Sequence, residues 1–267
     1  MAIKIYAGNT ELSAVYAGTT PLCAPPANVY AGDIPLCVGQ IPFSGQFNVA
    51  SSSFMQRNFL ASSAFAWSYS LWAKTTGASV NNVLIATWQT SGVNEEQVYI
   101  SLGTITMYDG LNSASLFAST QQFSQTWEHM LFVYDSANPT ATDRIRVYID
   151  GVRIVGTVNV ALNRNSYINS YARVHTIGRL AGIAGNYLDG NLSEVRFIDG
   201  QTLTPDAFGE FDGTGKWRNK EYAGAYGTNG FYLDFQNASN LGEDKSGNGN
   251  NWSSSNVTQS TDTPTSI

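Results

Sequence analysis

Residues 144–155 read Arg144-Ile145-Arg146-Val147-Tyr148-Ile149-Asp150-Gly151-Val152-Arg153-Ile154-Val155. Ile145, Val147 and Ile149 alternate with charged or polar-tipped residues, so they point to one face of an extended chain. Asp150-Gly151 favours the two-residue turn of a β-hairpin, and apolar residues resume directly after it. The stretch therefore predicts two antiparallel strands that bury one face.

Two upstream segments predict longer strands. Residues 127–134 are apolar on both faces in their second half, as expected of a central strand that is covered on both sides. Residues 66–74 alternate, which predicts a half-buried strand. Four apolar residues of that strand share one face: Trp67, Tyr69, Leu71 and Ala73. Similar short runs recur as far as residue 235, so we expect an all-β protein in which two antiparallel layers share an apolar interior.

Composition agrees with this expectation and excludes some partners. Charged residues make up 13% of the 267-residue chain and aromatic residues 12%, which is typical of many short strands joined by turns. The formal net charge is −6 and Lys and Arg do not cluster, which argues against nucleic acid as a partner. Apolar runs such as residues 130–134 are too short for a membrane-spanning helix. With two cysteines, burial rather than a disulfide scaffold must stabilise the fold.

The first 40 residues contain a threefold Tyr-Ala-Gly repeat, which predicts a separate β-repeat module (1–40) before a main domain (41–267). Such a unit is too small to be stable alone, so we expect it to stack on its siblings, on the main domain or on another subunit. The alternative is an N-terminal meander that only extends the sandwich. We expect Cys23 and Cys37, at equivalent places in two repeats, to be buried thiols rather than a disulfide. The residues expected at an anchor or oligomer interface are Tyr6, Leu12, Tyr16, Leu22, Tyr30 and Leu36.

Three local patterns predict further features. The strand at residues 104–108 closes on Asp109-Gly110, a second pair that favours a tight turn. Thr204-Pro205 places an N-cap residue before a proline, which predicts a short helix. After Trp252 the composition is typical of a flexible tail, which we expect to be ordered only where it is tied to the rest of the protein.

Several phrases of the sequence together resemble one known family. They are residues 68–74, 127–129, 147–151, 175–179, 187–200, 226–235, 244–252 and 262–265. In this order, over roughly residues 45–265, they resemble the laminin-G-like (concanavalin A-like lectin/glucanase) domain of structural proteins of tailed bacteriophages, especially marine and cyanobacterial ones. The resemblance implies an antiparallel jelly-roll β-sandwich.

The resemblance also implies a non-enzymatic protein of the virion surface, namely a capsid decoration, a head fibre or a tail fibre. The implied partners are other virion proteins and a host surface glycan, and we expect a homo-oligomer such as a trimer because the repeats need partners to bury their apolar face. The start of the chain lacks the pattern of a secretory signal, so we expect release from the host cytoplasm by lysis. A structural clamp without a ligand is an alternative.

A glycan hydrolase is the second alternative, from a different functional class. Such an enzyme of this fold needs two carboxylates on one strand, in a Glu-x-Asp-x-x-Glu spacing. The nearest match, Glu210-Phe211-Asp212, has Gly215 at the third position, and we expect Glu210 to lie in a loop. His129 and His175 lie far apart in the sequence, and we expect both to be structural. The sequence therefore names no catalytic residue.

The remaining candidates are oxygen-rich or aromatic. Asp244, Ser246, Asn248 and Asn250 alternate through a Gly-rich loop, like the first half of a calcium site, but no bidentate Glu follows. The preferred alternative is a turn in which these side chains cap their own backbone, with no cofactor. Aromatic rings stack on the C–H face of sugars, and amides pair with hydroxyls. The expected glycan contacts are Trp88, Tyr108, Tyr187 and Trp217, each of which can also be a packing residue.

Overall fold

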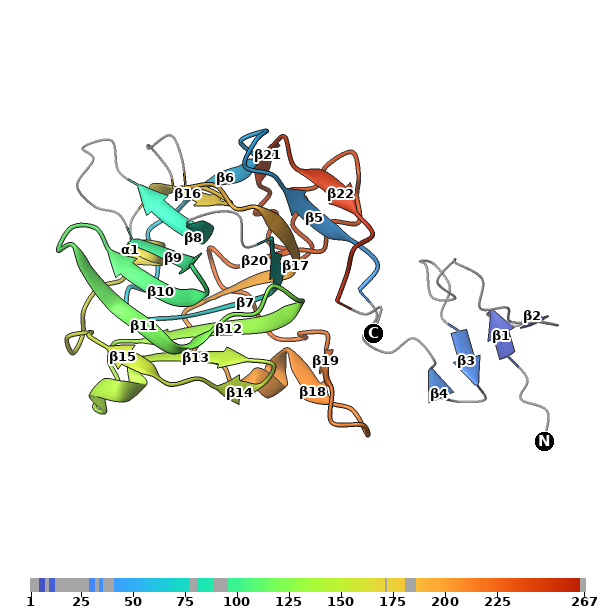
Figure 1. Ribbon diagram of the computed structural model, residues 1–267, viewed down its shortest axis with the longest axis horizontal. Coiled ribbons are helices and arrows are strands. Elements are labelled where there is room, and N and C mark those ends of the chain that lie inside the picture. The colour runs from blue at the N-terminus through green and yellow to red at the C-terminus, as the bar shows by residue number, and fades with distance from the viewer. Residues whose placement is uncertain are drawn as a thin grey trace.

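The computed structural model describes residues 5–7, 10–12, 29–31, 34–35, 41–76, 81–88, 96–170, 172–180 and 186–264. Two large antiparallel sheets lie face to face, as Figure 1 shows, so the predicted all-β sandwich is confirmed. Within these residues, no helix has the length and apolar character needed to cross a membrane.

We call the two layers sheet I and sheet II. Sheet I contains, in spatial order, β15 (Gly156–Val158), β11 (Ala114–Gln122), β10 (Thr104–Asp109), β9 (Glu96–Ser101), β8 (Asn82–Trp88), β16 (Arg173–Ile177), β6 (Phe54–Phe59) and β21 (Ser253–Ser255). Sheet II contains β14 (Val152–Arg153), β13 (Ile145–Ile149), β12 (Glu128–Asp135), β7 (Ala66–Thr75), β17 (Gly190–Asp199), β5 (Ser44–Phe47) and β22 (Thr258–Ser260), and β20 (Phe231–Leu233) pairs with β17.

Smaller elements connect or cover these sheets. They are η1 (Ala141–Asp143), the single turn α1 (Tyr167–Ser170), η2 (Pro205–Ala207) and the hairpin of β18 (Gly209–Phe211) and β19 (Trp217–Asn219). The short helix predicted at Thr204-Pro205 is therefore present as η2. The Thr204 hydroxyl donates to the Asp206 carboxylate instead of capping the backbone.

The N-terminal repeats form a separate four-stranded sheet with the order β2 (Thr10–Leu12), β1 (Ile5–Ala7), β3 (Val29–Ala31) and β4 (Ile34–Pro35). No described strand of the sandwich pairs with it. Two of the repeats thus each supply a strand pair, and Figure 1 shows their sheet outside the sandwich. Cys23 and Cys37 lie outside the described residues.

The core forms where alternation predicted it. The four alternating apolar residues of β7 all belong to one buried cluster between the sheets. They are Trp67, Tyr69, Leu71 and Ala73. The prediction that β7 is only half-buried is wrong, because Ser68, Ser70 and Trp72 on its other face are buried as well. That face of sheet II is covered by the chain after β17, through a second cluster that includes Phe208 and Tyr226.

Both predicted turns are present, but only one of them has two residues. Asp150 (φ 46°) and Gly151 (φ 77°) make the two-residue turn between β13 and β14. After β10, however, the connection spans residues 110–113, and Asp109 accepts hydrogen bonds from two backbone N–H groups within it. The tight turn in sheet I is Leu102-Gly103, with φ of 48° and 85°, between β9 and β10.

The segment after Trp252 supplies an edge strand to each sheet. β21 pairs with β6, and β22 pairs with β5. Asp262 then accepts hydrogen bonds from Lys74 Nζ at 2.7 Å and Trp127 Nε1 at 2.8 Å. A segment with the composition of a flexible tail is thus tied down along its described length, to residue 264.

Candidate functional site

The outer face of sheet I, which points away from sheet II, carries aromatic, amide and hydroxyl side chains. On β9 and β10 the residues that alternate with core residues are Gln97, Tyr99, Thr106 and Tyr108. Trp88, at the end of β8, is half-buried on the same face. The polar residues of this face come from strands whose other face fills the core, so the scaffold holds them rigidly.

The register of the strands brings these side chains into rows. One row crosses sheet I through Gln56, Thr176, Ala86, Gln97, Tyr108 and Ser115. A second row runs through Val83, Tyr99, Thr106 and Ala118. Because neighbouring strands are about 4.8 Å apart, Gln97 and Tyr108 can touch the same small ligand. Trp88 lies two residues beyond Ala86, on the same face of β8.

Part of this face is occupied by the chain after β16. Leu180 packs with Val83 and Ala86, and the Arg179 guanidinium lies 3.3 Å from the centre of the Phe54 ring. Tyr187 forms a β-bridge with Arg179. This segment thus covers part of β6 and β8 and reaches Tyr99 on β9, while Gln97 and Tyr108 remain half-buried.

The structure therefore brings three of the four predicted glycan contacts to one side of the molecule. Trp88 and Tyr108 lie on the outer face of sheet I, and Tyr187 lies beside it. Trp217 is on β19, over sheet II, with its ring against the backbone of Gly151 and Gly209. Gln97, Tyr99 and Thr106 were not among the predicted contacts, because the sequence of one strand does not show which residues of the neighbouring strand lie beside it.

Tyr99 shows that this face is partly shielded from water. Burial raises the pKa of its phenol, and a hydrogen bond with Thr106 opposes the rise. A neutral phenol can donate and accept hydrogen bonds and still offer its ring for stacking. The face is thus suited to neutral polyhydroxylated ligands.

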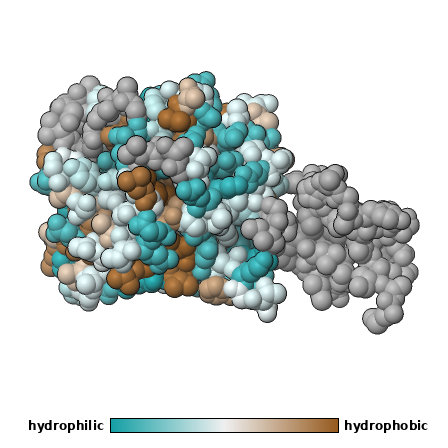
Figure 2. Space-filling view, in the orientation of Figure 1, coloured by the Kyte–Doolittle hydropathy of each residue, from teal (hydrophilic) through white to brown (hydrophobic). Residues whose placement is uncertain are grey.

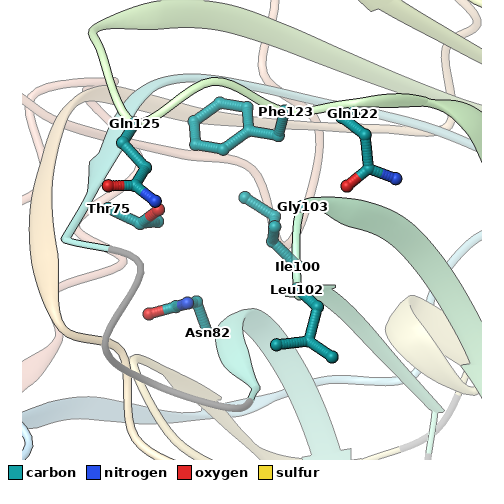
Figure 3. Close-up of a pocket in the computed structure, with 8 residues that line it drawn as sticks. All are labelled: Thr75, Asn82, Ile100, Leu102, Gly103, Gln122, Phe123 and Gln125. Carbon is teal, nitrogen blue, oxygen red and sulfur yellow. The ribbon is translucent and has the colours of Figure 1, made fainter.

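A pocket of about 310 Å³ opens at one end of the sandwich, where several strands end (Figure 3). It is lined by Thr75, Asn82, Ile100, Leu102, Gly103, Gln122, Phe123 and Gln125. We call it the end pocket. On the surface of the sandwich as a whole, Figure 2 shows hydrophilic and hydrophobic residues interspersed on the visible side. The sequence analysis named none of the lining residues, since they meet only when β7 to β11 are assembled.

Two buried carboxylates lie side by side at the end of the β9–β10 hairpin that is farther from the end pocket. Glu96 and Asp109 are register partners, on the inner face of sheet I. Arg164 pairs with both, at 2.8 Å from Asp109 and 3.6 Å from Glu96. The Glu96 carboxylate also accepts hydrogen bonds from the Ser166 hydroxyl and the Tyr167 N–H. Burial raises the pKa of Glu96; the hydrogen bonds of Arg164 and Asn112 lower that of Asp109 despite its burial.

This carboxylate pair has the residue types of a glycosidase site but not its surroundings. Both side chains are almost completely buried, and both form ion pairs with the Arg164 guanidinium. A glycosidase acid and base must instead reach the scissile bond from an open cleft. The arrangement is therefore a structural ion-pair network that fixes the segment around Arg164 to sheet I.

The two carboxylates named for the hydrolase alternative lie on or next to the β18–β19 hairpin. Glu210 lies on β18 and not in a loop as predicted, because residues 209–211 pair with β19. Hydrogen bonds from Thr214 and Arg218 lower the pKa of Asp212, which caps the turn of this hairpin. An ionised turn cap cannot serve as a general acid.

Both histidines are buried. His129 Nε2 and Ser70 Oγ are 2.9 Å apart, and burial followed by the charge of Arg196 lowers the pKa of His129 to about 3. His175 stacks on Phe59 at 3.8 Å, and burial lowers its pKa to about 3 as well. Ser70 and His129 resemble a nucleophile and base, but both are fully buried, so no substrate can reach them.

In the loop that resembles half of a calcium site, the oxygens of Asp244, Ser246 and Asn250 accept hydrogen bonds from the protein. The Asp244 carboxylate accepts hydrogen bonds from the N–H groups of Tyr232, Ser246 and Asn250, and from the Ser246 hydroxyl. Asn248 donates its amide to the carbonyls of Gly227 and Gly230. Among the described residues, no group of three or more acidic, His or Cys side chains could hold a metal ion. This arrangement supports the capped turn.

The expected anchor residues are only partly visible. Tyr6, Leu12 and Tyr30 lie on β1, β2 and β3, and Tyr6 and Tyr30 are register partners. Tyr16, Leu22 and Leu36 lie outside the described residues.

Three solved structures illustrate the similarity of this sandwich to known folds. A candidate carbohydrate-binding protein from Bacteroides ovatus is 17% identical, with a TM-score of 0.58 over 88% of this chain and 64% of that one. A SAP-like pentraxin from Limulus polyphemus is 14% identical (TM-score 0.47, 61% of this chain, 78% of that one). The LG4-5 domains of mouse laminin alpha1 are 12% identical (TM-score 0.45, 72% and 48%).

At 17% identity, the similarity to the Bacteroides structure shows the fold alone. No curated protein sequence matches the chain. Residues 48–209, more than half of the chain, match the family described as the Concanavalin A-like lectin/glucanases superfamily. The chain therefore belongs to this superfamily.

Proposed function

We propose that this protein is a non-catalytic glycan-binding protein whose main binding surface is the outer face of sheet I. The observation that carries the proposal is the row in which Gln97 and Tyr108 are neighbours, with Trp88 nearby on the same face. A ring can stack on the C–H face of a sugar while the amide pairs with its hydroxyls. The description of the Bacteroides protein as a candidate carbohydrate-binding protein is consistent with this proposal.

The direct test is glycan binding by the purified chain and its variants. Tyr108→Ala and Gln97→Ala remove side chains that do not fill the core, so we expect each to weaken oligosaccharide binding at least tenfold without unfolding the protein. Phe211→Ala removes a 54% exposed aromatic ring over sheet II and serves as the matched control. Equal binding by all variants, measured by calorimetry with a glycan selected on an array, would refute this surface.

The non-catalytic part of the proposal has its own test. Oligosaccharides that bind should remain intact after prolonged incubation, because the described carboxylate pair at Glu96 and Asp109 is buried and ion-paired with Arg164. Release of reducing ends that persists in Tyr108→Ala but is lost on changing Glu210 or Asp212 would instead favour a hydrolase.

We further propose that the protein is displayed on a bacteriophage virion, with residues 1–40 as its attachment to the particle or to sister chains. The family resemblance of the sequence and the separate sheet formed by β1 to β4 support this role. Deleting residues 1–40 should leave the sandwich folded by circular dichroism but abolish oligomerisation and incorporation into particles. Continued assembly of the truncated chain would refute the anchor.

A further inference from the structure

We propose that the end pocket is a second binding site, which takes the terminal residue of a neutral glycan. The proposal rests on the proposed function only for the ligand class, since the end pocket shares no residue with the binding row on sheet I. The row would contact the body of an oligosaccharide, and the end pocket would select its end.

The size of the end pocket fits a single sugar. Its volume of about 310 Å³ is at the lower end of the range for small-molecule sites in proteins. It lies between the ends of β7, β8 and β11 and the Leu102-Gly103 turn, as Figure 3 shows. A hollow bounded on several sides by strand ends accepts the end of a chain more readily than its middle.

Polar groups in the end pocket are available for sugar hydroxyls. Among the described residues, neither the Thr75 hydroxyl nor the Gln125 amide has a hydrogen-bond partner. The Gln122 amide donates only one long bond, 3.3 Å, to the Thr104 hydroxyl. Asn82 is held in place because its Oδ1 accepts a hydrogen bond from the Asp189 N–H at 3.0 Å. Amides and hydroxyls both donate and accept, which matches the mixed character of sugar hydroxyls.

The end pocket also has apolar walls. Phe123 is 6% exposed and belongs to the core, so its position is fixed. Leu102 is 79% exposed at the tip of the turn between β9 and β10. A side chain so exposed gains little from folding, and its place beside the opening suits contact with the C–H groups of a sugar.

The charges around the end pocket select against acidic sugars. None of the described residues that line it is charged. Lys74, next to Thr75 on β7, is paired with Asp262 at 2.7 Å. The nearby Glu128 carboxylate accepts hydrogen bonds from Ser124. A carboxylated sugar would therefore enter without a cationic partner and would lose hydration, whereas a neutral sugar avoids this cost.

The test uses the full chain and simple sugars. The probes are the methyl glycosides of glucose, galactose, mannose and N-acetylglucosamine, with N-acetylneuraminic acid as the acidic comparison, titrated up to about 50 mM by NMR. We expect at least one neutral glycoside to bind with a Kd of about 1 to 10 mM. Gln125→Ala and Gln122→Ala should each weaken this binding at least fivefold, and Phe211→Ala, which removes an exposed ring outside both proposed sites, should leave it unchanged.

Leu102→Asn provides a variant that keeps the fold. Asn tolerates the positive φ of this position, so the turn is preserved while the apolar contact is removed, and we expect weaker binding with an unchanged melting temperature. The proposal is overturned if no neutral glycoside binds, if binding survives both Gln variants, or if N-acetylneuraminic acid binds more tightly. Retained oligosaccharide binding that depends on Tyr108 would then show that the proposed function stands without this site.

Discussion

At the scale of single residues, buried polar groups determine how this sandwich responds to pH and to metals. The clearest case is Asp109, which is 1% exposed and accepts hydrogen bonds from Arg164 Nη2 and Asn112 Nδ2, each at 2.8 Å. These bonds lower the pKa of Asp109 although burial alone would raise it. The folded state favours the charged form of Asp109. Its stabilising effect is therefore fully present above the pKa that Asp109 has in the unfolded chain, and it is lost as the pH falls through the pKa that Asp109 has in the folded protein.

Asp109→Asn should therefore destabilise the protein at neutral pH by about 3 kcal/mol, since it leaves Arg164 with only part of its buried counter-charge. The difference from the wild type should begin to shrink below about pH 4, because the carboxylate of the unfolded wild type is then protonated while that of the folded protein is still charged. Urea unfolding at pH 7, 5 and 3.5 measures this. Asp143→Asn, which breaks the more exposed pair with Arg153, should cost less than about 1 kcal/mol at every pH.

Calcium should have little effect on stability. The Asp244 carboxylate already accepts four hydrogen bonds from the protein, and Arg57 donates to the side-chain oxygen of Asn250. An ion would have to displace these donors next to a guanidinium. We expect the melting temperature in 5 mM CaCl2 to lie within about 1 °C of that in EDTA. A calcium-dependent rise that disappears in Asp244→Asn would instead establish a metal site.

At the scale of elements, the alternation of apolar residues predicted hairpins whose parts are close in the sequence. It did not predict contacts between segments that are distant in the sequence. The hairpin at Asp150-Gly151 was predictable because its turn and its apolar face lie within twelve residues. The burial of Ser68 and Ser70 was not, since it depends on residues around Phe208 that fold back over sheet II. Likewise, Trp88 and Tyr108 could be named from the sequence, but only the register shows that Gln97 lies beside Tyr108.

The strand β22 illustrates a stabilising element that composition alone hides. Three of its residues pair with β5, and Gln259 donates to the carbonyls of Phe235 and Gln236. Ending the chain at Asn256 should lower the free energy of unfolding by about 3 kcal/mol, at roughly 1 kcal/mol for each buried or ladder hydrogen bond. Asp262→Asn, which affects only the half-exposed pair with Lys74 and the Trp127 contact, should cost about 1 kcal/mol or less. Equal stability of the truncated and full chains would mean that β22 is not a structural strand.

At the scale of the whole molecule, the two layers each bury one histidine in neutral form. His129 is on β12 of sheet II, and His175 is on β16 of sheet I, where its Nδ1 donates to the Arg173 carbonyl at 3.1 Å. Burial, with smaller effects of Arg196 on one and of Arg57 and Arg173 on the other, lowers both pKa values to about 3. In the unfolded chain the same groups titrate near 6.5.

The unfolded chain should therefore bind about two more protons than the folded one between pH 6 and pH 5, above the range in which most carboxylates titrate. Stability should fall toward acid pH with a slope of up to about 2.7 kcal/mol per pH unit, or about 1.4 for each histidine. His129→Gln and His175→Gln should each roughly halve that slope, whatever they do to stability at pH 7. Since the two residues sit in different sheets, their effects on the slope should add in the double variant. Denaturant unfolding at closely spaced pH values measures the slope, and an unchanged slope in either variant would show that its histidine is already charged in the folded protein.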